Sequence, residues 1–122
     1  MQIESYKELI AYKKGYELVK VIYKITSKFP REEIHGITSQ MKRSAISIPS
    51  NIAEGYMRGS KEYVQFLKIA LGSSTELETQ LSLSKDLGFC KILDFEKAYN
   101  LNQEVIRLLR TYISRMAERN NN

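Results

Sequence analysis

The chain has 122 residues, of which 43% are hydrophobic and 27% charged, and its formal net charge is +5. This length suits one domain, and the composition is too apolar for a disordered chain. One cysteine and one histidine exclude a disulfide framework, a Cys/His zinc site and most catalytic pairs of a nucleophile with a histidine base.

Turn and capping residues divide the chain into four predicted helices. Ser5 and Glu8 have the spacing of a capping box, which predicts the start of the first helix. Later boundaries are marked by residues that begin or end helices: Pro30, Gly55, Gly59, Gly88 and Asp94. We therefore expect a single all-α domain over residues 1–122, with helices at about 6–29, 31–57, 61–87 and 95–118. Helices of this length with short connections favour an up-down-up-down antiparallel four-helix bundle.

Pro49 lies inside the second predicted helix and removes one backbone hydrogen bond, so this helix must kink or split near Ile48. We predict a kink, because the apolar pattern keeps one angular phase on both sides of the proline. That pattern defines the core face of the helix: Ile34, Ile37, Met41, Ala45, Ile48, Ile52 and Tyr56.

A polar stripe runs beside this core face and consists of Gln40, Arg43, Ser44, Ser47, Asn51, Glu54 and Arg58. The simplest interpretation is a face in contact with water. The serines and the asparagine are small for such a face, however, and this favours a packed polar seam against another helix.

The third predicted helix has an apolar face made of Tyr63, Leu67, Ala70, Leu71, Ser74, Leu77 and Leu81. Glu78 falls within the same arc and needs a partner, for which Arg43 is the candidate. The polar seam is therefore predicted to include Gln40, Arg43, Ser47, Asn51, Glu54 and Glu78. Gly72 and the two serines after it lack bulk, so we expect another helix to approach closely there; the alternative is a helix break at Gly72.

Motifs for catalysis or metal binding are weak in this sequence. Glu32 and His35 have the Glu-x-x-His spacing of a di-iron bundle, but the second histidine that such a site needs is absent. Cys90 has no nearby histidine, and the chain has no phosphate-binding glycine loop and no Gly-x-Ser-x-Gly motif. We expect no enzymatic activity, no metal and no cofactor.

Basic residues concentrate on the first and last predicted helices, at Lys13, Lys20, Lys24 and Lys28 and at Arg107, Arg110, Arg115 and Arg119. If these helices are neighbours, the eight residues can form one basic surface for the phosphates of RNA or DNA. A charged face in contact with water only is the alternative.

The first predicted helix is apolar over about 200° of its circumference, twice the minimum width of a core-facing stripe. The residues concerned are Leu9, Tyr12, Tyr16, Leu18, Val19, Ile22, Tyr23, Ile25 and Phe29. One bundle cannot bury all of this arc, so we predict self-association. An unusually large aromatic core is the alternative.

The N-terminal residues, MQIESYKELI, lack the pattern of an export signal, and no apolar stretch approaches the ~18 residues of a membrane span. We therefore expect a soluble cytoplasmic protein with no membrane partner.

Two runs, QMKRSAISIPSNIAEG at 40–55 and FLKIALGSSTELE at 66–78, resemble the four-helix-bundle proteins of the 23S ribosomal RNA intervening-sequence family. Such proteins are encoded within inserts of some bacterial 23S rRNA genes or elsewhere in the genome, and the accessory proteins of diversity-generating retroelements are similar in fold. The family signature falls on Gln40, Arg43, Ser47, Pro49, Asn51, Glu54, Gly55, Gly72, Ser73, Glu76 and Glu78.

The resemblance implies a barrel-like homopentamer with a basic surface that binds RNA or DNA or, in the retroelement branch, a reverse transcriptase. Together with the charge pattern, it favours a non-enzymatic, oligomeric nucleic-acid-binding protein without strong sequence specificity. The main alternative is a protein-interaction scaffold or accessory subunit with no nucleic-acid partner. An enzyme would require two carboxylates that converge on a bound metal.

Overall fold

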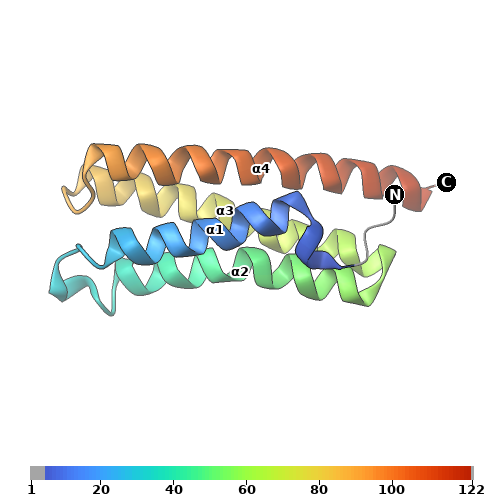
Figure 1. Ribbon diagram of the computed structural model, residues 1–122, viewed down its shortest axis with the longest axis horizontal. Coiled ribbons are helices and arrows are strands. Elements are labelled where there is room, and N and C mark those ends of the chain that lie inside the picture. The colour runs from blue at the N-terminus through green and yellow to red at the C-terminus, as the bar shows by residue number, and fades with distance from the viewer. Residues whose placement is uncertain (1–4, 122) are drawn as a thin grey trace.

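The chain folds into four long helices that run side by side and alternate in direction (Figure 1). The computed structural model describes residues 5–121, and its α-helices are α1 (Ile10–Thr26), α2 (Ile37–Arg58), α3 (Ser60–Asp86) and α4 (Ile92–Asn121). Helix α1 packs against α2 and α4, and α3 packs against the same two helices. Within the described residues there is no strand, so the prediction of an all-α four-helix bundle is confirmed.

The first helix is shorter than predicted at both ends. The Ser5 hydroxyl accepts a hydrogen bond from the Lys7 amide at 3.2 Å, but it caps a separate 3-10 turn, Tyr6–Glu8. Leu9 is extended, with φ −67° and ψ 131°, so α1 begins only at Ile10. At the other end α1 stops at Thr26, whose hydroxyl donates to the Ile22 carbonyl one turn back at 2.8 Å.

The second helix begins six residues later than predicted. Residues Arg31–Glu33 form a 3-10 turn, and Gly36, with ψ −120°, interrupts the chain before α2 starts at Ile37. Ile34 therefore lies outside the helix and is 56% exposed, so its prediction as a core residue is wrong. Helix α2 continues through Pro49 without a break, and the kink itself stays a prediction.

The third helix is continuous from Ser60 to Asp86, which excludes the alternative break at Gly72. It ends at a Schellman motif, in which the Phe89 amide donates to the Ser84 carbonyl at 2.8 Å and Gly88 adopts φ +79°. Helix α4 starts at Ile92, three residues before its predicted start, so Asp94 lies in the first turn instead of capping it.

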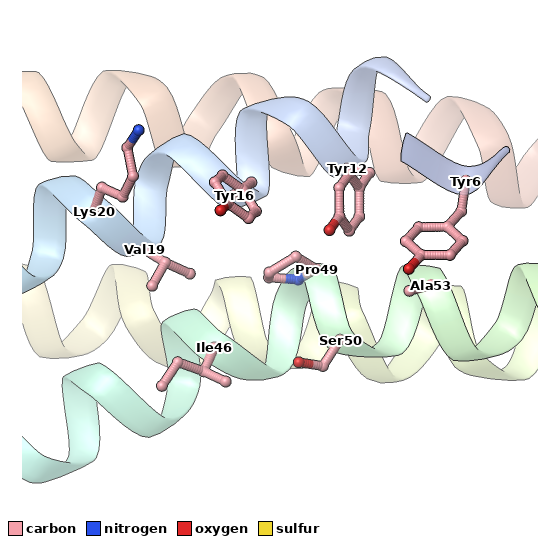
Figure 2. A pocket seen from close by; sticks show the side chains of 9 residues that line it. All are labelled: Tyr6, Tyr12, Tyr16, Val19, Lys20, Ile46, Pro49, Ser50 and Ala53. Carbon is pink, nitrogen blue, oxygen red and sulfur yellow. The ribbon is translucent and has the colours of Figure 1, made fainter. Parts of the chain in front are cut away.

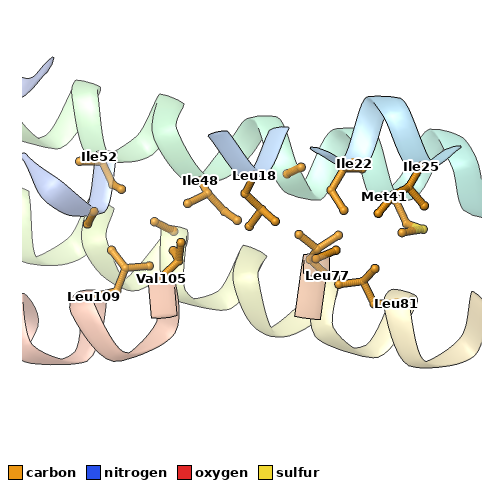
Figure 3. Packing of buried hydrophobic residues seen from close by; sticks show 14 of the residues in the cluster. Leu18, Ile22, Ile25, Met41, Ile48, Ile52, Leu77, Leu81, Val105 and Leu109 are labelled. Carbon is orange, nitrogen blue, oxygen red and sulfur yellow. The ribbon is translucent and has the colours of Figure 1, made fainter. Parts of the chain in front are cut away.

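The interior of the bundle is a column of aliphatic side chains supplied by all four helices (Figure 3). The predicted core stripe of α2 is fully buried at Met41, Ala45, Ile48 and Ile52. Polar side chains are also enclosed: Asn102 of α4 is fully buried and its amide donates to the Ser74 carbonyl of α3 at 2.9 Å. This bond fixes the level of α4 against α3, since a displaced amide would lose its partner in a dry interior.

Close contact between α2 and α3 depends on Gly55 and not on Gly72. A Cβ atom on Gly55 would lie 2.5 Å from Phe66 Cβ, a distance at which one helix must move. Gly72 is exposed, and a Cβ there would have nothing within 4 Å. The predicted close approach is therefore wrong for Gly72, which faces away from the neighbouring helices of its own chain. It does occur at the serine that follows, since Ser73 is buried and its hydroxyl lies 2.8 Å from Ser47 Oγ of α2.

Candidate nucleic-acid interface

Three of the four predicted lysines gather on the outer face of α1. Lys13, Lys20 and Lys24 are exposed and line one shallow depression of about 450 Å³ with Tyr16, Glu17 and Val21. We call Lys13, Lys20 and Lys24 the lysine cluster. They share a face because they are separated by seven and four residues, close to whole turns of an α-helix.

Lys28 lies apart from this cluster, after the end of α1, where its Nζ is 3.5 Å from Asp94 Oδ2 of α4. Farther along the contact between α1 and α4, Lys14 Nζ of α1 is 3.5 Å from Glu104 Oε1 of α4. Helices α1 and α4 are thus neighbours, as one basic surface requires. Carboxylates on α4 also lie at their boundary, so the positive potential is uneven between the lysines of α1 and the arginines of α4.

The four predicted arginines are all exposed but do not form one stripe. Arg115 and Arg119 line a pocket at the end of the bundle. Arg110 and Arg115 border a shallow depression that also includes Glu118. Arg107 lines neither. The arginines therefore border two adjoining depressions that share Arg115.

A row of tyrosines lies beside the lysine cluster, in a groove of about 410 Å³ between α1 and α2 (Figure 2). We call it the tyrosine groove. The ring centroids of Tyr6 and Tyr12 are 5.1 Å apart, and those of Tyr12 and Tyr16 are 6.0 Å apart. Lys20 Nζ lies 5.8 Å from the centre of the Tyr16 ring. Desolvation, followed by the Tyr6 and Tyr16 phenols, raises the pKa of Tyr12, so these surroundings favour its neutral form. Neutral aromatic faces next to ammonium groups suit stacked nucleobases or a protein partner.

The sequence indicated Tyr12 and Tyr16 only as part of the apolar arc and did not single out Tyr6, because the groove depends on residues of α2. Its α2 side consists of Ile46, Pro49, Ser50 and Ala53 (Figure 2). Several apolar groups of this face remain exposed: Tyr16 at 55%, Tyr23 at 42% and Ile46 at 42%. The alternative of a large aromatic core therefore fails for Tyr16 and Tyr23 in the single chain.

The polar stripe of α2 packs against α3 at its centre. The Ser73 hydroxyl of α3 donates to Ser47 Oγ at 2.8 Å, and the Asn51 amide donates to the same Oγ at 2.9 Å and to the Ser47 carbonyl at 2.7 Å. These side chains are half-buried or buried. Small polar groups that satisfy one another allow the two helices to lie close together.

Toward the ends of the stripe the side chains are in water. Gln40, Arg43 and Glu54 are exposed. Arg58 is also exposed. Its Nη2 lies 2.8 Å from Glu54 Oε2, and its Nη1 lies 3.2 Å from Glu62 Oε2. Those hydrogen bonds raise the pKa of its guanidinium. In water, such contacts add little to folding stability.

The predicted buried pair of Arg43 with Glu78 does not form among the described residues. Lys85 lies seven residues after Glu78, on the same face of α3, and its Nζ is 4.5 Å from the Phe95 ring of α4. This face of α3 is therefore turned toward α4, whereas Ser73 is turned toward α2. Glu78 is half-buried on the face of α3 that is turned toward α4, whereas Arg43 of α2 is exposed. The two residues therefore do not face each other.

Catalytic candidates are not assembled in the part of the chain described. Glu32 and His35 are exposed, and no group of three His, Cys, Asp or Glu side chains in residues 5–121 is placed to hold a metal. Cys90 is buried, and desolvation, followed by the charge of Asp94, raises the pKa of its thiol. A protonated, enclosed thiol is a poor nucleophile.

None of the helices formed by residues 5–121 combines the length and apolar character that a membrane crossing requires.

Comparison with known proteins identifies relatives of this bundle. The sequence profile of a family described as 23S rRNA-intervening sequence protein matches residues 7–111. The fold is similar to the 1.70 Å crystal structure of a protein of unknown function from the S23 ribosomal protein family of Bacteroides thetaiotaomicron VPI-5482. That similarity has a TM-score of 0.79 at 24% identity and covers 86% of this chain and 96% of the other. No curated protein matches the chain.

Proposed function

The chain belongs to the 23S rRNA-intervening sequence protein family, and from this premise we propose that it is a non-enzymatic bundle protein that binds RNA or DNA. The observation that carries the proposal is the lysine cluster around Tyr16. Ammonium groups on flexible stems neutralise phosphates without reading bases, so binding is expected to have little sequence preference.

We further propose that copies of this chain associate through the outer face of α1 and α2. Tyr16 and Ile46 line the tyrosine groove and remain exposed, and Tyr23 is exposed two turns farther along α1. Aromatic groups of this kind are enriched where proteins contact one another. Because each subunit carries its own lysine cluster, a symmetric oligomer would present several clusters to one strand; the family resemblance implies five.

A salt titration tests nucleic-acid binding directly. Fluorescence anisotropy with labelled single-stranded RNA and with duplex DNA gives the affinity at several salt concentrations. If phosphates are neutralised, log affinity falls against log salt with a slope of about −0.9 per phosphate on duplex DNA and about −0.7 on single strands.

Two charge-reversal variants localise the contact. The double variant Lys20→Glu, Lys24→Glu should reduce affinity for all sequences alike and make the salt slope less steep. The control, Lys61→Glu with Lys68→Glu, changes the net charge equally at exposed positions of α3 and should have a smaller effect. Equal losses in both variants contradict a site at the lysine cluster, and both proteins are checked by circular dichroism and light scattering.

A protein-interaction scaffold is the second candidate, and the tyrosine groove favours it because the groove is mostly apolar in its lining. A scaffold predicts little salt-dependent retention of RNA at low ionic strength. Absence of measurable binding by the unmodified protein under those conditions would support this candidate and refute the nucleic-acid proposal.

A further inference from the structure

The end of the bundle contains a pocket that is separate from the lysine cluster. It measures about 500 Å³ and is lined by Leu9, Tyr63, Tyr112, Arg115, Met116 and Arg119. Its lining comes from the residue just before α1, the first turn of α3 and the last part of α4. Its volume falls in the range of pockets that hold small organic ligands.

The two arginines give the pocket its electrostatic character. Arg115 and Arg119 are one helical turn apart and both are exposed. Neither forms an ion pair with any described residue. Two guanidinium groups on one side of a small pocket can hold the oxygens of a single phosphate. The N-terminal end of α3, which begins at Ser60, adds partial positive charge nearby.

The remaining lining is aromatic and aliphatic, and it contains one unsatisfied polar group. Tyr63 is 9% exposed, and its hydroxyl has no hydrogen-bond partner in residues 5–121. Desolvation, with the phenols of Tyr112 and Tyr56, raises the pKa of Tyr63 to about 12. The hydroxyl itself is enclosed, so a ligand in the pocket would meet the Tyr63 ring and not its oxygen.

We propose that this pocket binds a nucleoside monophosphate, with the phosphate on Arg115 and Arg119 and the base against the rings of Tyr63 and Tyr112. Aromatic rings stack on a nucleobase of any kind, and the largely apolar lining of the pocket suits such a planar group. The ligand is either a free mononucleotide or the phosphorylated terminus of a single strand. The strand-end form rests on the proposed function, since it adds recognition of an end to general binding of the backbone.

Paired probes test the inference. The first pair is a labelled single-stranded RNA with a 5′-phosphate and the same strand with a 5′-hydroxyl, measured by anisotropy. The second pair is adenosine 5′-monophosphate and adenosine, measured by calorimetry. The phosphorylated member should bind about tenfold more tightly, which corresponds to about 1.4 kcal/mol. A preference for the phosphorylated probe that is seen only with the strands assigns the site to strand ends. A preference that is also seen with the mononucleotide shows that free nucleotides enter the pocket as well.

Variants locate the effect. Arg115→Gln with Arg119→Gln should abolish the preference for phosphate, whereas Arg107→Gln with Arg110→Gln removes the same charge from α4 outside the pocket and should preserve it. Tyr112→Ala should weaken both members of each pair, because it removes a ring of the lining against which the base packs. All these arginines are exposed, so the fold should be unchanged by circular dichroism.

Two results overturn the proposal: equal affinity for phosphorylated and unphosphorylated probes, or equal loss of the preference in both arginine variants. The variant Lys20→Glu, Lys24→Glu distinguishes failure of the pocket proposal from failure of the proposed function. It should bind both strands more weakly and still prefer the phosphorylated one, because the lysine cluster does not line the pocket.

Discussion

Substitution of glycine by alanine at two positions should change stability in opposite directions. In a helix interior, alanine is favoured over glycine by about 1 kcal/mol. At Gly72 the new methyl group would have nothing within 4 Å, so Gly72→Ala should gain this amount. At Gly55 the methyl carbon would lie 2.5 Å from Phe66 Cβ and 3.1 Å from Tyr63 Cδ1.

The cost at Gly55 can be bounded from these contacts. Overpacking costs about 1–3 kcal/mol, and we expect the upper end, because a Cβ atom cannot rotate away and α2 must therefore separate from α3. After the gain in helix propensity, Gly55→Ala should be destabilised by about 2 kcal/mol. Its free energy of unfolding should then lie about 3 kcal/mol below that of Gly72→Ala.

Urea unfolding followed by circular dichroism at fixed protein concentration measures both values. Light scattering is needed alongside, because the open space at Gly72 describes a single chain and a change in subunit number would alter apparent stability. A Gly55→Ala protein as stable as the unmodified chain would refute the argument that this contact sets the spacing of α2 and α3.

Three further predictions concern polar groups. Ser47→Ala should cost about 1–2 kcal/mol in urea unfolding, because the Asn51 and Ser73 donors lose their shared acceptor; Arg43→Ala should stay within about 0.5 kcal/mol, and an equal cost would contradict this account. Folding raises the pKa of Tyr63 from 10.0 to about 12, so its neutral form stabilises the chain fully below pH 10, and this contribution is lost as the pH rises through 12. Tyr63→Phe should reduce that alkaline loss of stability, and an unchanged profile would show that other groups cause it. Asn102→Asp should lose about 3–5 kcal/mol at pH 7, because it places an unpaired carboxylate in the core, and should recover part of this near pH 4; no dependence on pH would mean that water reaches the site.

Local rules were reliable where a residue acts within its own segment. Gly88 predicted the end of the third helix because only its left-handed backbone completes the Schellman motif there. These rules predicted helix boundaries less well where two residues of one segment indicate different starts. Ser5 does cap a turn, but Leu9 is extended and delays the helix, and Gly36 delays α2 although Glu32 and Glu33 suit a helix start.

The candidate site was only partly predictable for a related reason. The lysine cluster follows from helical spacing along one element, so the sequence was sufficient to find it. The tyrosine groove and the pocket at Arg115 and Arg119 each combine side chains from different helices. They form only if particular helices are neighbours with a particular offset along the bundle axis. Neither property can be inferred from a single segment of the sequence.

The all-α class, the four helices and the stripe of α2 that faces the core follow from the sequence, because hydrophobic periodicity and helix-ending residues act over a few turns. The contacts between helices follow only from the folded arrangement. It turned Glu78 toward α4 and away from Arg43, placed Gly55 instead of Gly72 at a close contact, and left Tyr16 exposed beside the lysine cluster. The physical reason is that periodicity fixes the face of a residue, whereas its partner depends on the rotation and axial offset of the packed helices, which many small contacts set together.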